Sequence, residues 1–170
     1  MDFARGNFID NQWLKPTGGA VIRSINPATA DEVVLEAPTD PAHAALAVAA
    51  AARAWPAWAA LSAEDRMAAL RRFGRELAGR TEALARAITM EMGKTIREAR
   101  IEATSLIQRI ELVAEQQLPA VKAWSAQGVA GECRYHPLGV IAVIGPYNFP
   151  LHLCHAHILP ALATGNSVIL

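Results

Sequence analysis

The turn from Gly145 to Pro150, with the sequence Gly-Pro-Tyr-Asn-Phe-Pro, combines residue types and spacing that suit chemistry. Two prolines restrict the backbone on either side of Asn148, whose side-chain amide donates hydrogen bonds without carrying charge. A rigid, uncharged donor suits the stabilisation of negative charge that develops on a substrate oxygen. The alternative is an asparagine that bonds its own backbone, which from spacing alone is the commoner role in a turn.

The segment after this turn carries three histidines and a cysteine that together invite a metal-binding interpretation: His152, Cys154, His155 and His157. At about 100° per residue on a helix, Cys154 and His157 share one side, and His152 and His155 share the opposite side. Each pair supplies fewer ligands than the three or four protein ligands of zinc sites, so we predict no metal site. Cys154 and Cys133 are interpreted as structural thiols rather than nucleophiles.

The elements that position the turn are predicted from apolar patterning. Residues 138–144 are nearly all apolar and mostly β-branched, which favours a strand covered on both faces, as in a parallel sheet. Residues 151–163 indicate a helix that stops at Gly165, and residues 167–170 begin another strand. This order predicts a βαβ unit, in which Asn148 follows the carboxyl end of a strand, where ligands of open α/β sheets bind.

A region of short strands is expected before the helical part of the chain. Residues 7–14 and 21–25 have strand-like patterns, and the Pro-Thr-Gly-Gly cluster at residues 16–19 is typical of a turn. We therefore predict a small antiparallel hairpin in this region.

From Asp40 onward the apolar spacing indicates four helices. The first begins at Asp40 and stops or kinks at Pro56, the second begins at Ser62, the third ends at Gly93, and the fourth opens at Thr95. The second helix is predicted to present one apolar face, with Arg66, Arg71, Arg72 and Arg75 mostly toward water. The apolar face consists of Met67, Leu70, Phe73 and Leu77. Trp55 and Trp58 are interpreted as packing residues, and Glu91 and Lys94 as a surface ion pair.

Composition narrows the class of protein. The 170 residues include 16 Lys and Arg and 16 Asp and Glu, so the formal net charge is zero, which argues against a nucleic-acid or acidic-membrane partner. Residues 1–5 lack the pattern of a signal peptide, and no apolar run reaches the roughly 18–20 residues that span a bilayer. The two cysteines form no disulfide framework. We expect a cytoplasmic protein.

An ordered set of short motifs carries a family resemblance. The motifs are Ile25-Asn26-Pro27, Glu91-Met92-Gly93-Lys94, Pro137-Leu138-Gly139-Val140, Pro146 to Pro150, and Pro160 to Asn166. In this order the chain resembles the amino-terminal part of the NAD(P)-dependent aldehyde dehydrogenase superfamily. Tyr147 in place of the more common Trp, with the later His152-Leu153 and His157-Ile158 pairs, resembles the succinylglutamate-semialdehyde group within it.

The resemblance implies an α/β protein with an incomplete aldehyde dehydrogenase fold. Residues 1–36 would form an amino-terminal β-hairpin arm, and residues 37–125 the helical part of the cofactor domain. Residues 126–136 would begin a bridging arm for oligomerisation. Residues 137–170 would form the first βαβ unit of a Rossmann-like parallel sheet. A homo-oligomer is expected for the complete protein.

The resemblance also implies a reaction and a set of site residues. The family oxidises a small-molecule aldehyde to a carboxylic acid with NAD or NADP, through a thiohemiacetal on a cysteine and a thioester that a glutamate-activated water hydrolyses. Asn148 would donate to the thiohemiacetal oxygen, and the cofactor would contact Ile144, Gly145, Pro146 and Tyr147. The nucleophilic cysteine and the general-base glutamate are absent from these 170 residues, so the chain alone is predicted to be inactive.

Two other functions compete with this one. A lone βαβ unit leaves sheet edges and strand faces unpaired, which favours either the front part of a larger protein or a non-catalytic chain that packs against a partner. An unrelated nucleotide-binding module would need a G-x-G-x-x-G or P-loop motif, and the sequence contains neither.

Overall fold

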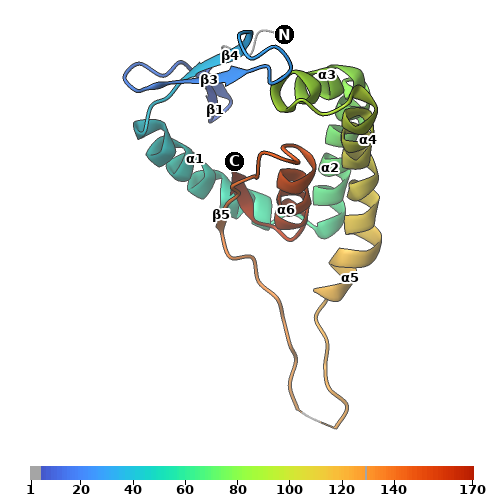
Figure 1. Ribbon diagram of the computed structural model, residues 1–170. Helices are drawn as coiled ribbons and strands as arrows, with labels where there is room; N and C mark the ends of the chain where they lie inside the picture. Colours follow the sequence, from blue (N-terminus) through green and yellow to red (C-terminus); the bar gives the residue numbers. More distant parts are fainter. Residues whose placement is uncertain (1–4, 129) are drawn as a thin grey trace.

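The computed structural model describes residues 5–128 and 130–170. Residues 1–4 and residue 129 lie outside the described residues. Residues 1–4 belong to the predicted amino-terminal arm and to the segment compared with a signal peptide, and residue 129 belongs to the predicted bridging arm. Figure 1 shows two small hairpins beside a body of helices, with a long excursion of chain leaving the body between α5 and β5.

The amino-terminal region contains two antiparallel hairpins instead of the single one predicted. Strand β1 (Asn7–Ile9) pairs with β2 (Gln12–Leu14), and β3 (Val21–Ile25) pairs with β4 (Val33–Pro38). The prediction was wrong because Asp10 and Asn11 adopt positive φ angles of 52° and 61°, which makes a tight turn inside residues 7–14. Strand β4 extends past the region boundary predicted at residue 36.

The helices are α1 (Ala42–Ala59), α2 (Ala63–Ala78), α3 (Thr81–Met92) and α4 (Ile96–Leu112), which continues through a π-helical turn (Val113–Gln117) into α5 (Leu118–Ala120). The capping residues predicted at Ser62 and Thr95 are confirmed: Ser62 Oγ accepts from the Asp65 N–H at 3.0 Å and Thr95 Oγ1 from the Glu98 N–H at 3.3 Å. The helix predicted to begin at Asp40 begins at Ala42 instead, and Pro41 is its N-cap. Of the stop or kink predicted at Pro56, the stop does not occur, because α1 continues through this residue to Ala59.

The core lies where α2, α4 and α6 (His152–Ala163) meet, and its buried members are Met67, Leu70, Ile110, Val113, Leu159 and Ala163. Phe73, which we expected in this core, is 45% exposed. The neighbouring Gly74 takes the buried position instead, because α4 comes so close that a Cβ there would overlap Cδ1 of Ile110. A second cluster of small residues joins α3 to α4.

The predicted βαβ unit is confirmed. Strand β5 (Val140–Ala142) pairs in parallel with β6 (Ser167–Ile169), with Val140 opposite Ser167, and α6 connects them. The strand is shorter than predicted, and the flanking Leu138 and Ile144 are 87% and 95% exposed. In Figure 1, α6 lies between α1 and the α2–α4 layer.

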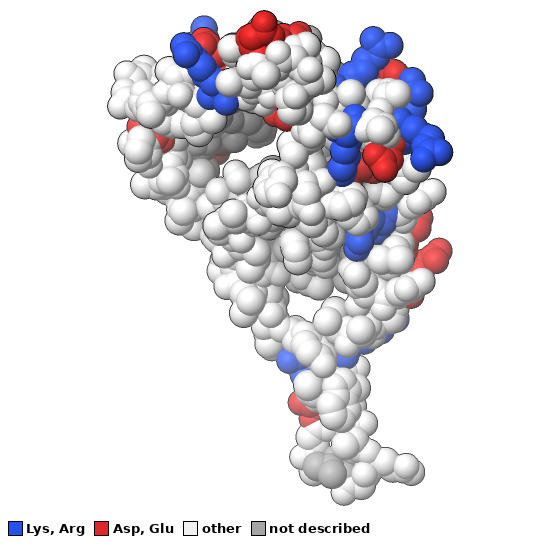
Figure 2. Space-filling model, in the orientation of Figure 1, with Lys and Arg blue, Asp and Glu red and all other residues white. Residues whose placement is uncertain are grey.

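Charge is distributed unevenly over the molecule. Figure 2 shows charged side chains gathered over the hairpin end and the outer helices α3 and α4, whereas the surface over α6 and β5 in this view is almost free of charge. Among the described residues, no helix is both long and apolar enough to cross a membrane.

Candidate active site

The turn that carries Asn148 leaves the carboxyl end of β5 and leads directly into α6. Asn148 is exposed, and within the described part of the chain its side chain forms no hydrogen bond with protein. The amide therefore does not bond its own backbone, which was the alternative role for this residue. Its N–H groups remain available to a ligand.

The four residues before Asn148 form an exposed segment. Ile144 is 95% exposed and Tyr147 is 81% exposed. Gly145 lies directly over α6, because a Cβ at this position would overlap the Sγ of Cys154. Cys154 itself is a buried free thiol, as we expected of a structural cysteine. The segment presents backbone and uncharged side chains at the carboxyl edge of the parallel strands, a place where open α/β sheets bind ligands.

A buried carboxylate lies beneath the turn. Glu102, on the inner face of α4, has a side chain that is only 1% exposed. Its Oε1 accepts hydrogen bonds from the backbone N–H groups of Leu151 and His152, both at 3.1 Å. These N–H groups lie at the start of α6 and lack partners within that helix. Glu102 thus fastens the exit of the turn to α4.

Lys94 completes this anchor, in the connection between α3 and α4. Its Nζ bonds Oε2 of Glu102 and also lies 3.5 Å from the centre of the Phe149 ring, an arrangement typical of a cation–π contact. The predicted Glu91–Lys94 surface pair was wrong: Lys94 bonds Glu102, and Glu91 accepts from Ser24 at 3.4 Å. Gly93, with φ of 71°, ends α3 in a left-handed conformation and redirects the chain between Glu91 and Lys94.

The histidines of α6 serve packing and hydrogen bonding. His152 Nδ1 lies 2.9 Å from Ser105 Oγ, and His155 donates from Nε2 to the carbonyl of Leu106 at 2.9 Å. Both histidines therefore face α4, whereas His157 is exposed. Burial lowers the pKa of His155 below its ordinary value, and the positive charge of Arg109 acts in the same direction. Within residues 5–128 and 130–170, no group of three His, Cys, Asp or Glu side chains is placed to hold a metal ion.

The far end of α6 is held by three side chains from α1 and α2. The indole N–H groups of Trp55 and Trp58 donate to the carbonyls of Gly165 and Leu162 at 3.1 and 2.9 Å, which helps to explain why α1 persists through Pro56. Arg66 donates from Nε to the carbonyl of Ala163 at 2.9 Å. Arg66 is thus an exception among the arginines expected mostly toward water, because the carbonyls at a helix carboxyl end attract a cation.

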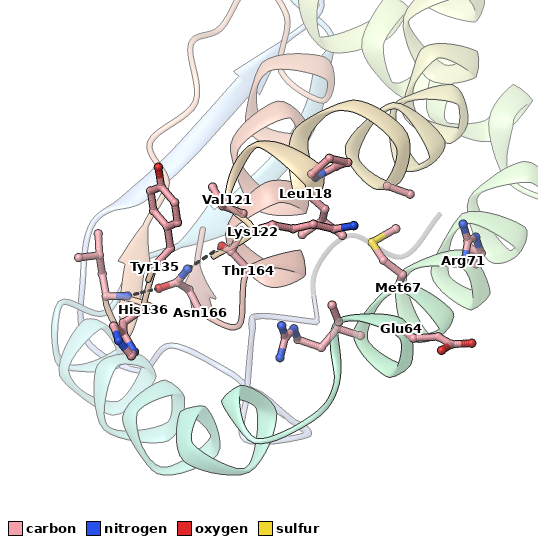
Figure 3. A pocket seen from close by; sticks show the side chains of 15 residues that line it. Glu64, Met67, Arg71, Leu118, Val121, Lys122, Tyr135, His136, Thr164 and Asn166 are labelled. Atoms are coloured by element: carbon pink, nitrogen blue, oxygen red, sulfur yellow. Dashed lines mark hydrogen bonds between the residues drawn. The ribbon is translucent and has the colours of Figure 1, made fainter. Parts of the chain in front are cut away.

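A second asparagine, Asn166, closes the amino end of β5. Its Oδ1 accepts from the N–H groups of Leu138 and Gly139 at 2.7 and 3.0 Å, and its Nδ2 donates to Thr164 Oγ1 at 3.0 Å and to the carbonyl of Ala161 at 3.1 Å. Figure 3 shows Asn166 beside Thr164, at one wall of a groove of about 570 Å³. All of its amide atoms are used inside the fold.

Glu102 is the site residue that our sequence reasoning missed. It shares a helix face with Ala99, Ala103, Leu106 and Ile110, all of which are buried. A carboxylate on an otherwise apolar face is a signal that could have been found, because acidic residues are rarely buried without partners. Its partners, however, are backbone N–H groups far along the chain, and helical spacing carries no information about them.

Comparison with known proteins gives a consistent result. The model of the aldehyde dehydrogenase family matches residues 13–170. The N-succinylglutamate 5-semialdehyde dehydrogenase of Chromobacterium violaceum is 41% identical over 164 residues, which cover 95% of this chain and 34% of that protein. The chain thus spans about a third of the length of such curated relatives.

Solved structures show the same partial match. A lactaldehyde dehydrogenase from Escherichia coli superposes with a TM-score of 0.86 at 32% identity, over 94% of this chain and 34% of the other. An NAD-dependent benzaldehyde dehydrogenase from Corynebacterium glutamicum superposes with a TM-score of 0.85 at 30% identity, over 97% and 37% of the two chains.

Proposed function

The chain belongs to the aldehyde dehydrogenase family, and on that premise we propose that it forms the amino-terminal part of an enzyme that oxidises an aldehyde to a carboxylic acid with NAD or NADP. The name of the relative from Chromobacterium violaceum supports a semialdehyde as the substrate. Because the chain covers 34% of that relative, we propose that the cysteine nucleophile and the general base come from sequence that these residues do not include.

The observation that carries this proposal is the state of the Asn148 amide. It is exposed on a turn that a buried carboxylate fastens from behind, and protein groups in the described residues leave its N–H donors available. In the proposed reaction, Asn148 Nδ2 donates a hydrogen bond to the substrate oxygen as negative charge builds on it. A fixed donor stabilises that charge without having to reorient during the reaction.

The residues proposed to contact the cofactor are Ile144, Gly145, Pro146 and Tyr147. They fit a nicotinamide dinucleotide in that they form an exposed, uncharged segment beyond the carboxyl end of β5. The absence of a side chain at Gly145 lets the segment pack directly on Cys154 of α6, because the place of a Cβ is taken by the Sγ. When bound, the cofactor supplies the acceptor for the hydride that leaves the substrate.

A second candidate function is assembly with a partner chain. It is favoured by the apolar side chains exposed around β5, among them Leu138 at 87% and Ile144 at 95%. In the enzyme, the same surface would pack against the rest of the protein. Homo-oligomerisation through residues 126–136 and a cytoplasmic location also stay predictions.

The test uses the full-length protein that carries these residues. Formation of reduced cofactor is followed by absorbance with N-succinylglutamate 5-semialdehyde and, for comparison, an unrelated aldehyde. We expect turnover with the semialdehyde, and we expect Asn148→Ala to lower kcat by about 10²–10³-fold without a change in unfolding temperature. Absence of aldehyde-dependent turnover would contradict the enzymatic proposal, and an unchanged kcat in Asn148→Ala would remove Asn148 from the reaction.

A further inference from the structure

We propose that Glu102 is a positioning residue for Asn148, which sets the catalytic amide in place by binding the backbone at the exit of its turn. The inference rests on the proposed function, because it assigns Glu102 a part in the same reaction. Glu102 does not act on the substrate itself in this role. It acts through the geometry of the segment between β5 and α6.

The contacts of Glu102 reach the turn by two routes. Through Oε1 it binds the N–H groups of Leu151 and His152 at 3.1 Å each, and Leu151 directly follows Pro150, the last residue of the turn. Through Oε2 it binds Lys94, whose Nζ lies 3.5 Å from the ring centre of Phe149, the neighbour of Asn148. One carboxylate thus restrains both the backbone and a side chain immediately after Asn148.

Burial makes these contacts demanding. The Glu102 side chain is 1% exposed and that of Lys94 is 19% exposed, so water offers the carboxylate little alternative solvation. A buried carboxylate is stable only when nearby donors satisfy its oxygens. Within the described residues the donors to Glu102 are the N–H groups of Leu151 and His152 and the Lys94 ammonium, so the turn must keep the position that supplies them. The negative charge also suits the amino terminus of a helix.

The role is specific to the turn because α6 is independently fastened elsewhere. Trp55, Trp58 and Arg66 bind the carbonyls at its carboxyl end, and Leu159 and Ala163 are completely buried in the core. Removal of the Glu102 carboxylate should therefore leave most of α6 in place. The resulting freedom falls on the first residues of α6 and on the turn before them.

A double-mutant cycle with Asn148 distinguishes positioning from general support of the fold. In the full-length enzyme we expect Glu102→Ala to lower kcat by about 10²-fold, since a displacement of about 1 Å at a reacting group has effects of this size. In the Asn148→Ala background the same substitution should change kcat by less than about 2-fold, because the group it positions is already gone. A purely structural role would lower kcat equally in both backgrounds.

Two further variants keep the test decisive. If Glu102→Ala does not fold, Glu102→Gln replaces it, because its amide oxygen still accepts from the α6 N–H groups although the charge that binds Lys94 is lost. We expect it to lower kcat by about 10-fold, again only when Asn148 is present. The matched control is Glu111→Ala, which removes another ion-paired carboxylate of α4, bound to Arg71 at 2.7 Å, on a part of the helix remote from the turn. It should leave kcat unchanged.

The outcomes separate this inference from the proposed function. One outcome is that Asn148→Ala lowers kcat about 10²–10³-fold, whereas Glu102 substitutions lower kcat by the same factor with and without Asn148. This outcome would overturn the positioning role and leave the proposed function intact. An unchanged kcat in every Glu102 variant would do the same. Failure of the wild-type protein to oxidise any aldehyde would instead overturn the proposed function, and the positioning role with it.

Discussion

An asparagine lies near each end of β5, Asn166 beside its amino end and Asn148 in the turn after its carboxyl end, and the two side chains differ in their hydrogen bonding. At the amino end, Asn166 is 6% exposed and uses its amide oxygen and nitrogen in hydrogen bonds to Leu138, Gly139, Ala161 and Thr164. At the carboxyl end, Asn148 is exposed and forms no side-chain hydrogen bond with the described residues. The same amide chemistry therefore closes the fold at one end of the strand and is available to a ligand at the other.

The surroundings of the two asparagines differ in the same sense. Around Asn166 the side chain itself makes the contacts that join the βα unit together. Around Asn148 the contacts are made by other residues. Glu102 and Lys94 hold the residues that follow Asn148, and the Asn148 amide itself stays exposed. We infer that stability and function are divided between the two ends. Asn148 is held in place by contacts of its neighbours, and its own amide has no partner among the described residues. Such an amide is suited to bind a ligand.

The largest expected effect on stability comes from substitution of Asn166. Asn166→Ala leaves the N–H groups of Leu138 and Gly139 without their acceptor, and the Gly139 bond is buried. We expect a loss of about 3 kcal/mol in the free energy of unfolding, since each unsatisfied buried group costs about 1–3 kcal/mol. Denaturant unfolding of the full-length protein measures it.

Asn148→Ala is the matched control for this comparison. It removes an exposed amide that makes no bond within the described residues, so its free energy of unfolding should stay within about 0.5 kcal/mol of wild type. Equal losses in the two variants would show that the division between a structural and an available asparagine is wrong.

Sequence reasoning separated these two asparagines only in part. Asn148 was singled out because two prolines flank it after an apolar run, and both signals are local. The bonds of Asn166 to Leu138 and Gly139 join residues far apart in the chain, and those of Glu102 to Leu151 and His152 are more distant still. Local patterns do not encode such partners. The signal available in the sequence for Glu102 was its place on an otherwise apolar helix face.

The fold shows the same limit. The caps at Ser62 and Thr95, the end of α3 at Gly93 and the βαβ order were predicted correctly because each depends on a few adjacent residues. A helix stop at Pro56 and a solvent-facing Arg66 were not found, because contacts with α6 override local preference: α1 continues through the proline, and the arginine bonds a helix-end carbonyl. The first hairpin was missed because the turn at Asp10 and Asn11 was not recognised.

A smaller effect on stability is expected where the turn before Asn148 packs against α6, at Gly145 and Cys154. A Cβ at Gly145 would overlap the buried Sγ of Cys154, so Gly145→Ala forces the turn or α6 to move. Overpacking of this kind costs about 1–3 kcal/mol, and we expect about 2 kcal/mol from thermal or denaturant unfolding.

The reciprocal substitution tests whether this contact is the cause. Cys154→Ala removes the Sγ, so Gly145→Ala should cost less than about 0.5 kcal/mol in that background. The same loss with and without Sγ would show that Gly145 is restricted by something other than the thiol. In that case the contact between Gly145 and Cys154 would not be what holds the turn against α6.

The smallest expected effect is a pH dependence of the free energy of unfolding that comes from His155, a buried residue of α6. Burial lowers the pKa of His155, whereas the bond from Nε2 to the Leu106 carbonyl opposes this shift and limits its size. Because the folded state binds the proton more weakly than the unfolded chain, His155 contributes its full stability above about pH 6.5 and loses it as the pH falls toward its lowered folded-state pKa. We expect the free energy of unfolding of the full-length protein to decline between about pH 7 and about pH 5 more steeply than that of His155→Gln.

The turn around Asn148 contains no histidine or carboxylate, so Asn148→Ala should keep the wild-type slope. Parallel slopes for wild type and His155→Gln would mean that acid acts elsewhere in the protein.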